Sequence, residues 1–204
     1  MAQDLKSSSV ITATALDADG LSTADAVGNN AALTLGGALT SGGSYTADTG
    51  TARQITLLSA DDDSGITFTV VGTDIHGDAQ SETVTGADTG TATSSGYFAT
   101  ISSITAVGNP AGDVSAGINA NVAGVIFKGR TRVKNLIWSG GGAIGTINIR
   151  NSSISGTSLI AVRSDPTLGV NAQLSLDPDG VLFDSGAYIT YAETQCNSVT
   201  AFYG

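Results

Sequence analysis

The chain has 204 residues and a formal net charge of −10, and 41% of its residues are hydrophobic, 13% charged and 5% aromatic. The hydrophobic content is enough to bury a core, which excludes a chain disordered by composition. The acidic balance argues against nucleic acid as a partner, because phosphate repels such a surface. A single cysteine, Cys196, excludes an internal disulfide and a cysteine-based zinc motif.

Short segments rich in threonine and valine, punctuated by many of the 27 glycines, predict an all-β protein with many turns. No apolar run approaches the roughly 20 residues needed to span a bilayer, so no membrane partner is expected. The first residues, MAQDLKSSSV, lack the apolar stretch of a signal peptide. The sequence therefore predicts a soluble protein made in the cytoplasm.

The first half of the chain starts with a polar segment, residues 1–9, which we expect to form a flexible arm. An alternating strand follows in residues 9–16 and meets a predicted turn at residues 17–20. Residues 21–31 fit either one helical turn or a loop, and residues 31–37 are typical of a short strand.

The segment ITFTVVGTDIHGDAQSETVTG, residues 66–86, contains the one histidine, His76. Alternation in its first part predicts a strand, and Gly77 supplies the backbone freedom that a tight turn needs. A hydrolase triad would need a positioned nucleophile, and a metal site would need further His or Cys ligands. Neither is identifiable, so the pattern favours a hairpin turn over a catalytic site.

Three acidic segments, at residues 17–20, 61–65 and 177–180, resemble the opening of a calcium loop. None continues with the remaining ligands of such a loop, and aspartate also favours turns because its side chain caps its own backbone. We therefore predict no metal, no cofactor and no catalytic residue, while structural calcium stays an alternative for these turns.

Charge is divided unevenly along the chain. Residues 1–120 carry two basic and thirteen acidic residues, a net of −11, whereas residues 121–204 carry a net of +1. This predicts an acidic β-sandwich domain, Ig-like or jelly-roll-like, at 1–115, a linker of small polar residues at 116–123, and a smaller antiparallel β domain at 124–204. The β character of the second domain is supported by several strand-like segments: TINIR, SLIAVRS, AQLSLD, AYITYAE and VTAFYG.

The most unusual local feature is the basic segment KGRTRVK, with Lys128, Arg130, Arg132 and Lys134 at every second position. Alternation would place the four cations on one face of a strand, where they repel one another and favour an anionic neighbour. Three interpretations stay open: nucleic-acid binding, a solvated edge strand protected by charge, and docking on an acidic protein surface, including another copy of this chain.

Two stretches resemble a known class of proteins. Residues 52–108, with the pattern FTVVGTD, SETVTG and YFATISSIT, are similar to a β module of tailed-bacteriophage virion proteins. Residues 177–204, with GVLFDSGAYITYAE and VTAFYG, are similar to the C-terminal strands of small phage structural proteins. The resemblance implies a virion structural protein made in the host cytoplasm, and it transfers no catalytic residue.

On this basis we expect a non-enzymatic capsid decoration or cement protein that forms homo-oligomers and contacts other virion proteins such as the major capsid protein. Modest contacts repeated over a shell would bind through multivalency. A tail, adaptor or fibre-associated virion protein is an alternative. A carbohydrate- or host-receptor-binding module is another, although Trp138 and the five tyrosines are not clustered in the sequence.

Overall fold

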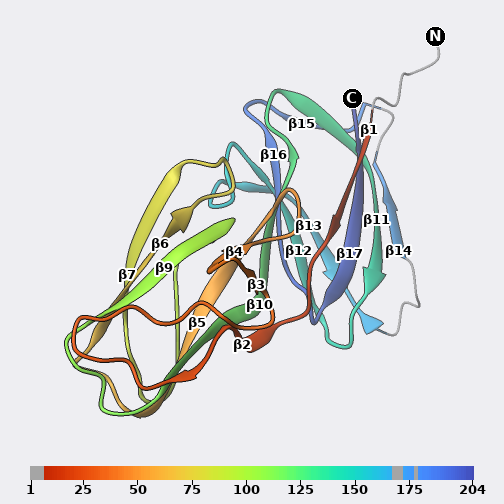
Figure 1. The fold of residues 1–204 in the computed structure, drawn as a ribbon. Helices are drawn as coiled ribbons and strands as arrows, with labels where there is room; N and C mark the ends of the chain where they lie inside the picture. Colours follow the sequence, from red (N-terminus) through yellow and green to blue (C-terminus); the bar gives the residue numbers. More distant parts are fainter. Residues whose placement is uncertain (1–6, 167–171, 177–178) are drawn as a thin grey trace. The chain divides into compact units, whose positions relative to one another are not determined.

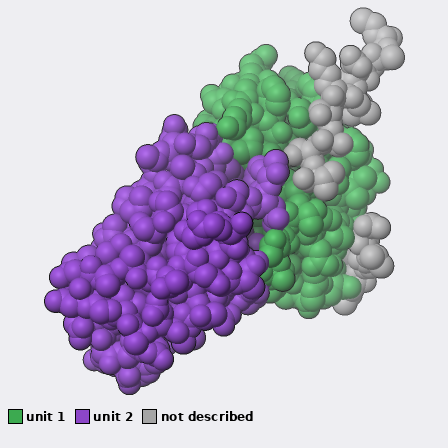
Figure 2. All heavy atoms as spheres, in the orientation of Figure 1, with its two compact units in different colours: residues 1–15, 121–204 green, residues 16–120 purple. Residues whose placement is uncertain are grey.

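A computed structural model describes residues 7–166, 172–176 and 179–204, which form β-strands joined by turns and loops (Figure 1). The chain divides into two compact units (Figure 2). The first, here called the acidic unit, consists of residues 16–120, and the second, here called the terminal unit, consists of residues 1–15 and 121–204. The all-β, sandwich-like class predicted from the sequence is confirmed.

The acidic unit contains a five-stranded antiparallel sheet in the order β3-β4-β9-β6-β7. Facing strands are β2, β5, β8 and the first part of β10, where β10 is hydrogen-bonded to both β2 and β5. The strand bounds are β2 (Asp17–Asp25), β3 (Thr40–Ser41), β4 (Ser44–Thr46), β5 (Thr51–Asp62), β6 (Thr67–Thr73), β7 (Ala79–Thr85), β8 (Asp88–Thr93), β9 (Thr100–Val107) and β10 (Val114–Phe127).

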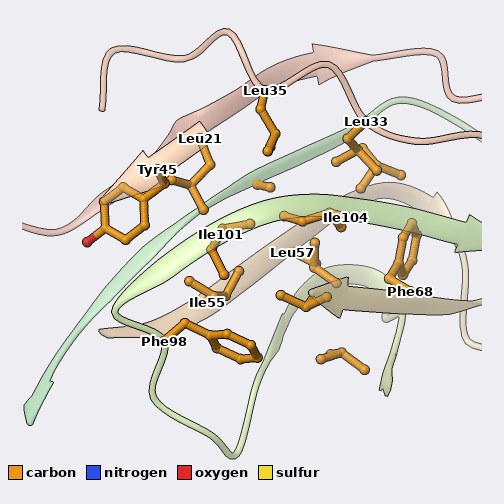
Figure 3. Close-up of a cluster of buried hydrophobic side chains, with 14 of the residues drawn as sticks. Leu21, Leu33, Leu35, Tyr45, Ile55, Leu57, Phe68, Phe98, Ile101 and Ile104 are labelled. Carbon is orange, nitrogen blue, oxygen red and sulfur yellow. The ribbon is translucent and has the colours of Figure 1, made fainter. Parts of the chain in front are cut away.

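The core of the acidic unit lies between these two sets of strands (Figure 3). Leu57 of β5, Phe68 of β6 and Ile104 of β9 are fully buried in it. The alternation predicted for residues 66–70 is present, since Phe68 and Val70 are buried whereas Thr67 and Thr69 are half-buried. Burial of such side chains is the main stabilising contribution, about 1.5–3 kcal/mol for each large one.

A charged side chain is also buried in this unit. Arg53 of β5 is 1% exposed, and its guanidinium Nη2 donates a hydrogen bond to the main-chain oxygen of Asn119. The main chain of Arg53 exchanges two hydrogen bonds with Phe98, of 2.9 and 2.8 Å. Burial raises the pKa of nearby Tyr45 to about 12, although the charge of Arg53 acts in the opposite direction. The arginine therefore links β5 to β10 through a polar contact inside the unit.

The terminal unit contains a five-stranded antiparallel sheet in the order β1-β17-β11-β14, with β15 also paired to β11. The second part of β10 pairs with β16, which pairs in turn with β12, and β12 with β13. The bounds are β1 (Ser7–Thr12), β11 (Thr131–Gly140), β12 (Gly145–Asn151), β13 (Ser158–Ser164), β14 (Ala172–Ser175), β15 (Val181–Phe183), β16 (Ala187–Ala192) and β17 (Cys196–Tyr203).

A second hydrophobic core fills the terminal unit. Leu136 and Trp138 of β11 pack in it with Ile149 of β12, Ile189 of β16 and Val199 of β17. All five side chains are at most 6% exposed. Each unit therefore has a core of its own.

Cys196 belongs to this second core and gives a direct test of it. Its side chain is fully buried, and burial raises the pKa of the thiol to about 12, which a main-chain hydrogen bond of Ser198 only partly offsets. Because the thiolate is the reactive form, we expect a thiol reagent at pH 8 to modify the native protein at least roughly hundredfold more slowly than the urea-unfolded protein. Equal rates would show that this core is open in solution.

The linker expected at residues 116–123 is not present, because these residues lie inside strand β10. Their small side chains are required by close packing. A Cβ atom on Gly117 would lie 2.0 Å from the main-chain oxygen of Asp17, and Ala116, Ile118 and Val122 are buried. Glycine and alanine here mark a close approach of β2 to β10, not a loose connection.

The start of the chain also differs from the expected organisation. Residues 7–12 form strand β1 instead of continuing a flexible arm to residue 9, and β1 pairs with β17 in the terminal unit. Residues 1–6 lie outside the described residues. The turn expected at residues 17–20 is the beginning of strand β2. The charge pattern could not show this, because pairing between the two ends of a chain leaves no local signal in composition.

Candidate functional site

The segment around His76 forms the turn of the β6–β7 hairpin. The main-chain nitrogen of Asp74 donates to the Asp78 oxygen at 2.9 Å, and Asp74 Oδ1 accepts hydrogen bonds from the nitrogens of His76 and Asp78 at 2.8 and 3.0 Å. Gly77 has a φ of 89°, which glycine adopts without strain. The predicted hairpin is confirmed, and the aspartate serves the turn as an intrachain cap.

The acidic segment at residues 61–65 has the same kind of local structure. Asp62 Oδ1 accepts hydrogen bonds from the Ser64 hydroxyl at 2.6 Å and the Ser64 nitrogen at 3.0 Å, and these bonds lower the pKa of the Asp62 carboxyl. The neighbouring Asp63 is fully buried and accepts a hydrogen bond from the Ala111 nitrogen at 2.8 Å. Within residues 7–166, 172–176 and 179–204, no three His, Cys, Asp or Glu side chains gather to hold a metal ion. Residues 177 and 178 of the third acidic segment lie outside the described residues.

The basic segment does not have the geometry that its alternation predicts. Lys128 and Arg130 lie in the bend between β10 and β11, and only Arg132 and Lys134 belong to strand β11. The four cations therefore do not share one face of a strand. Period-two alternation has this meaning only where the chain is extended, and the chain reverses direction here.

Two of the four cations have partners within the terminal unit. Arg130 Nε lies 3.8 Å from Asp184 Oδ1, with both side chains about 70% exposed. Arg132 Nη1 donates to the main-chain oxygens of Asp179 at 3.0 Å and Gly180 at 3.4 Å. The exposed ion pair is weak, because water and salt screen it and both side chains lose entropy when they pair. Arg130 is thus accessible to an external carboxylate, whereas Arg132 is held in place by the turn.

Strand β11 is not an edge strand at this position. Residues 131–133 pair with β15 on one side, and Val133 also pairs with Tyr203 of β17. The main-chain groups are used on both sides, so charge is not needed there to block strand addition. The interpretation of the basic segment as a protected edge is therefore wrong.

Arg130 and Arg132 line a surface hollow of about 310 Å³, together with Thr131, Leu182 and Gly204. We call these five residues the basic hollow. A hollow of this volume accommodates one or two side chains of a partner. Two guanidinium groups with an adjacent apolar side chain form an environment in which a carboxylate is readily bound.

An aromatic pair lies beside the basic hollow. The rings of Phe127 and Tyr203 have centroids 5.3 Å apart, and Phe127 is 41% exposed. Phe127 precedes the bend that carries Arg130, and Tyr203 precedes Gly204 of the hollow. Aromatic residues with arginine are enriched at protein interfaces. Sequence reasoning missed this pair because its two members come from opposite ends of the terminal unit's sequence.

A second hollow, of about 270 Å³, lies in the acidic unit and has a polar lining. Among the described residues it is lined by Ser22, Thr23, Ala24, Asp25, Thr34 and Gly36. No ring stands in that lining, and the Asp25 carboxylate is already used by the Thr34 nitrogen at 3.1 Å. Stacking on a sugar needs an exposed aromatic face, so this hollow gives the carbohydrate-binding alternative no support.

Among the described residues, no helix has the length and apolar character needed to cross a membrane. The sequence matches no protein-family profile and no curated protein. Among solved structures, the chain is similar to an allantoicase from Saccharomyces cerevisiae, with 8% identity, a TM-score of 0.30, and coverage of 98% of this chain and 91% of that one.

This match contradicts the expectation that the protein is not an enzyme, because an allantoicase is an enzyme. The non-enzymatic prediction is therefore not retained. At a TM-score of 0.30 the likeness transfers no fold, reaction, substrate or catalytic residue to this chain.

Proposed function

We propose that the protein is a structural component of a tailed-phage virion, a capsid decoration protein that binds acidic surfaces of neighbouring subunits through the basic hollow. The observation that carries the proposal is that one chain contains both an acidic unit and a hollow lined by two arginines. The acidic unit has one basic and twelve acidic residues, a net charge of −11, whereas the terminal unit presents Arg130 and Arg132 in one hollow. The resemblance of residues 52–108 and 177–204 to phage virion proteins supports the same proposal.

The physical argument concerns how copies meet. An acidic unit on one copy attracts the basic hollow on the next, which steers association and fixes orientation more than it adds affinity. The Phe127–Tyr203 pair beside the hollow supplies apolar area that can be buried at such a contact. Individually modest contacts of this kind become effective when many copies sit on one shell.

The location of the protein tests the assignment. Virions of the encoding phage are purified and separated into heads and tails, and each fraction is examined by mass spectrometry. The protein is expected in the head fraction, at a copy number comparable to that of the capsid subunits. Recovery in tails would replace the decoration role with the tail or adaptor alternative, and absence from virions would overturn the proposal.

The role of the basic hollow is tested by charge reversal with a matched control. Arg130→Glu and Arg163→Glu each change the net charge by the same amount at an arginine that is 70% or 67% exposed, and each removes one ion pair, Arg130–Asp184 at 3.8 Å or Arg163–Asp165 at 3.6 Å. Of these two arginines, Arg130 lines the basic hollow and Arg163 does not. We expect Arg130→Glu to weaken binding to heads roughly tenfold or more, and Arg163→Glu to have little effect.

Co-sedimentation with undecorated heads measures this difference. Wild-type binding is also expected to weaken as salt rises, because screening acts over about 10 Å at 0.1 M ionic strength. We prefer Arg130 to Arg132 for this test, because Arg132 also holds the turn at Asp179 and its loss could disturb the fold. Equal binding by both variants at low salt would exclude the basic hollow as the contact.

A further inference from the structure

We infer that β1 is an exchangeable strand: β1 of one copy can leave its own β17 and pair with β17 of a second copy. In the described structure β1 lies at the edge of its sheet and is hydrogen-bonded to β17 over six residue pairs, from Ser7↔Tyr203 to Thr12↔Ser198. The rest of the terminal unit begins only at residue 121. Strand β1 is therefore joined to its own unit through the whole acidic unit, and not by a short hairpin.

The position that β1 occupies beside β17, here called its seat, is specific for the sequence of β1. Ile11 is 2% exposed and belongs to the core of the terminal unit. It packs on Gly124 so closely that a Cβ atom there would lie 2.8 Å from Ile11 Cδ1. The hydroxyl of Tyr191, itself buried, donates to the Ile11 carbonyl oxygen at 3.4 Å. The segment that fits this seat best is another copy of β1, which makes a second copy of the chain the expected partner.

The connection that follows β1 has the properties of a hinge. Residues 13–16 belong to no strand, and Thr14, Ala15 and Leu16 are exposed. Leu16 is 48% exposed although it is a large apolar side chain. Ala13 packs against the terminal core and would leave it together with β1. Residues 14–16 belong to neither hydrophobic core, so they can change their backbone conformation without breaking core contacts, which is how exchanged strands are usually connected.

The equilibrium follows from the identity of the contacts. Closed and exchanged forms contain the same β1–β17 ladder and the same Ile11 seat, so their stabilities differ mainly through the hinge and the concentration of copies. The covalent connection through the acidic unit keeps a released β1 near its own seat, at an effective concentration of the order of 1 mM. Exchange should therefore be minor in dilute solution and become substantial where many copies are held close together.

The inference does not depend on the proposed function, because neither the basic hollow nor a virion takes part in it. Charge reversal at Arg130 leaves β1 and its seat unchanged. Failure of one proposal therefore leaves the other in place.

Mixed single-cysteine chains provide the test. In a Cys196→Ala background, one chain carries Thr12→Cys and the other Ser198→Cys. These positions face each other in the ladder, where Thr12 is exposed and Ser198 half-exposed. Opposed strand positions are close enough for a disulfide after small adjustments. Exchange would bring the two thiols together, giving a covalent heterodimer on a non-reducing gel that increases with total protein up to about 1 mM.

The control replaces Ser198→Cys with Ser185→Cys, a more exposed serine that lies outside β17 and therefore meets other copies by collision at least as readily. Both mixtures are incubated with urea below the unfolding transition, returned to buffer and oxidised. Heterodimer formation no greater than in the control would overturn the inference.

A kinetic variant checks that the cross-link reports strand release. Ile11→Ala weakens the seat in both forms, so we expect cross-linking to become roughly tenfold faster, because opening is the slow step. Ile11→Val is the milder alternative if the alanine variant loses its circular-dichroism signal, with an acceleration in the same direction. An unchanged rate in a folded variant would show that thiols meet without β1 leaving its seat, and would overturn the inference.

Discussion

Gly72→Ala is expected to destabilise the acidic unit by at least about 3 kcal/mol, although it adds a single methyl group. Gly72 lies in β6 between β7 and β9, where the β6–β9 register shifts between Val71 and Gly72. A Cβ atom at this position would lie 1.8 Å from the Thr100 main-chain oxygen and 2.8 Å from its carbonyl carbon. The obstacle is backbone in the adjacent strand, so it cannot rotate away as a side chain would.

Gly65→Ala is the matched control. Gly65 lies in the turn before β6, no atom lies within 4 Å of its built Cβ position, and its φ is not in the left-handed region. We expect its stability to change by no more than about 0.5 kcal/mol. Urea unfolding followed by far-ultraviolet circular dichroism measures both variants. Similar midpoints for the two would mean that β6 and β9 separate more easily than the close contact implies.

The β6–β9 contact illustrates which features the sequence could predict. The strand containing Phe68 and Val70 and the turn at residues 74–78 follow from signals confined to a few neighbouring residues: alternation, an aspartate cap and a glycine. Both were predicted and confirmed. No such local signal marks Gly72, because a glycine is required there by the main chain of Thr100, a residue of another strand.

The errors at residues 116–123 and at the start of the chain have the same origin. Small residues around Gly117 are typical of a linker, but here they allow β2 to approach β10. Strand β1 owes its position to β17, and the six pairs they form join residues near opposite ends of the sequence. Composition and charge describe surfaces and local flexibility well, but they carry no information on which distant strands meet.

The candidate site was predicted in part. The sequence indicated that residues 128–134 are unusual, and the structure shows Arg130 and Arg132 lining one hollow. The prediction that the four cations share one face of a strand was wrong, because a bend interrupts the alternation at Lys128 and Arg130. The intrachain partner Asp184 and the aromatic partner Tyr203 could not be found from spacing, since both belong to strands or turns far along the chain.

A basic hollow and an exchangeable strand would make different contributions to assembly. Electrostatic contacts at Arg130 would speed encounter and respond to salt. An exchanged β1 would instead join two copies through a six-pair ladder and the buried Ile11. This connection would open slowly and depend little on salt. A chain with both features could associate quickly and then become held in place, with the second step favoured by the high local concentration on a shell.

Leu57 and Leu58 provide the second large prediction, since they are neighbours on β5 that point to opposite faces. Leu57 is fully buried in the core of the acidic unit, whereas Leu58 is 40% exposed. Leu57→Ala removes the same atoms as Leu58→Ala, but it also leaves a cavity among side chains held by two sheets. We expect a loss of about 2–5 kcal/mol in the free energy of unfolding for Leu57→Ala, and less than about 1 kcal/mol for Leu58→Ala. Both leucines lie on the same strand, and both variants replace leucine with alanine and lose the same β-propensity. The difference between their urea midpoints therefore measures the effect of burial alone. If the two variants unfold together, or if Leu58→Ala is the less stable one, then the faces of β5 are reversed, and with them the assignment of the core shown in Figure 3.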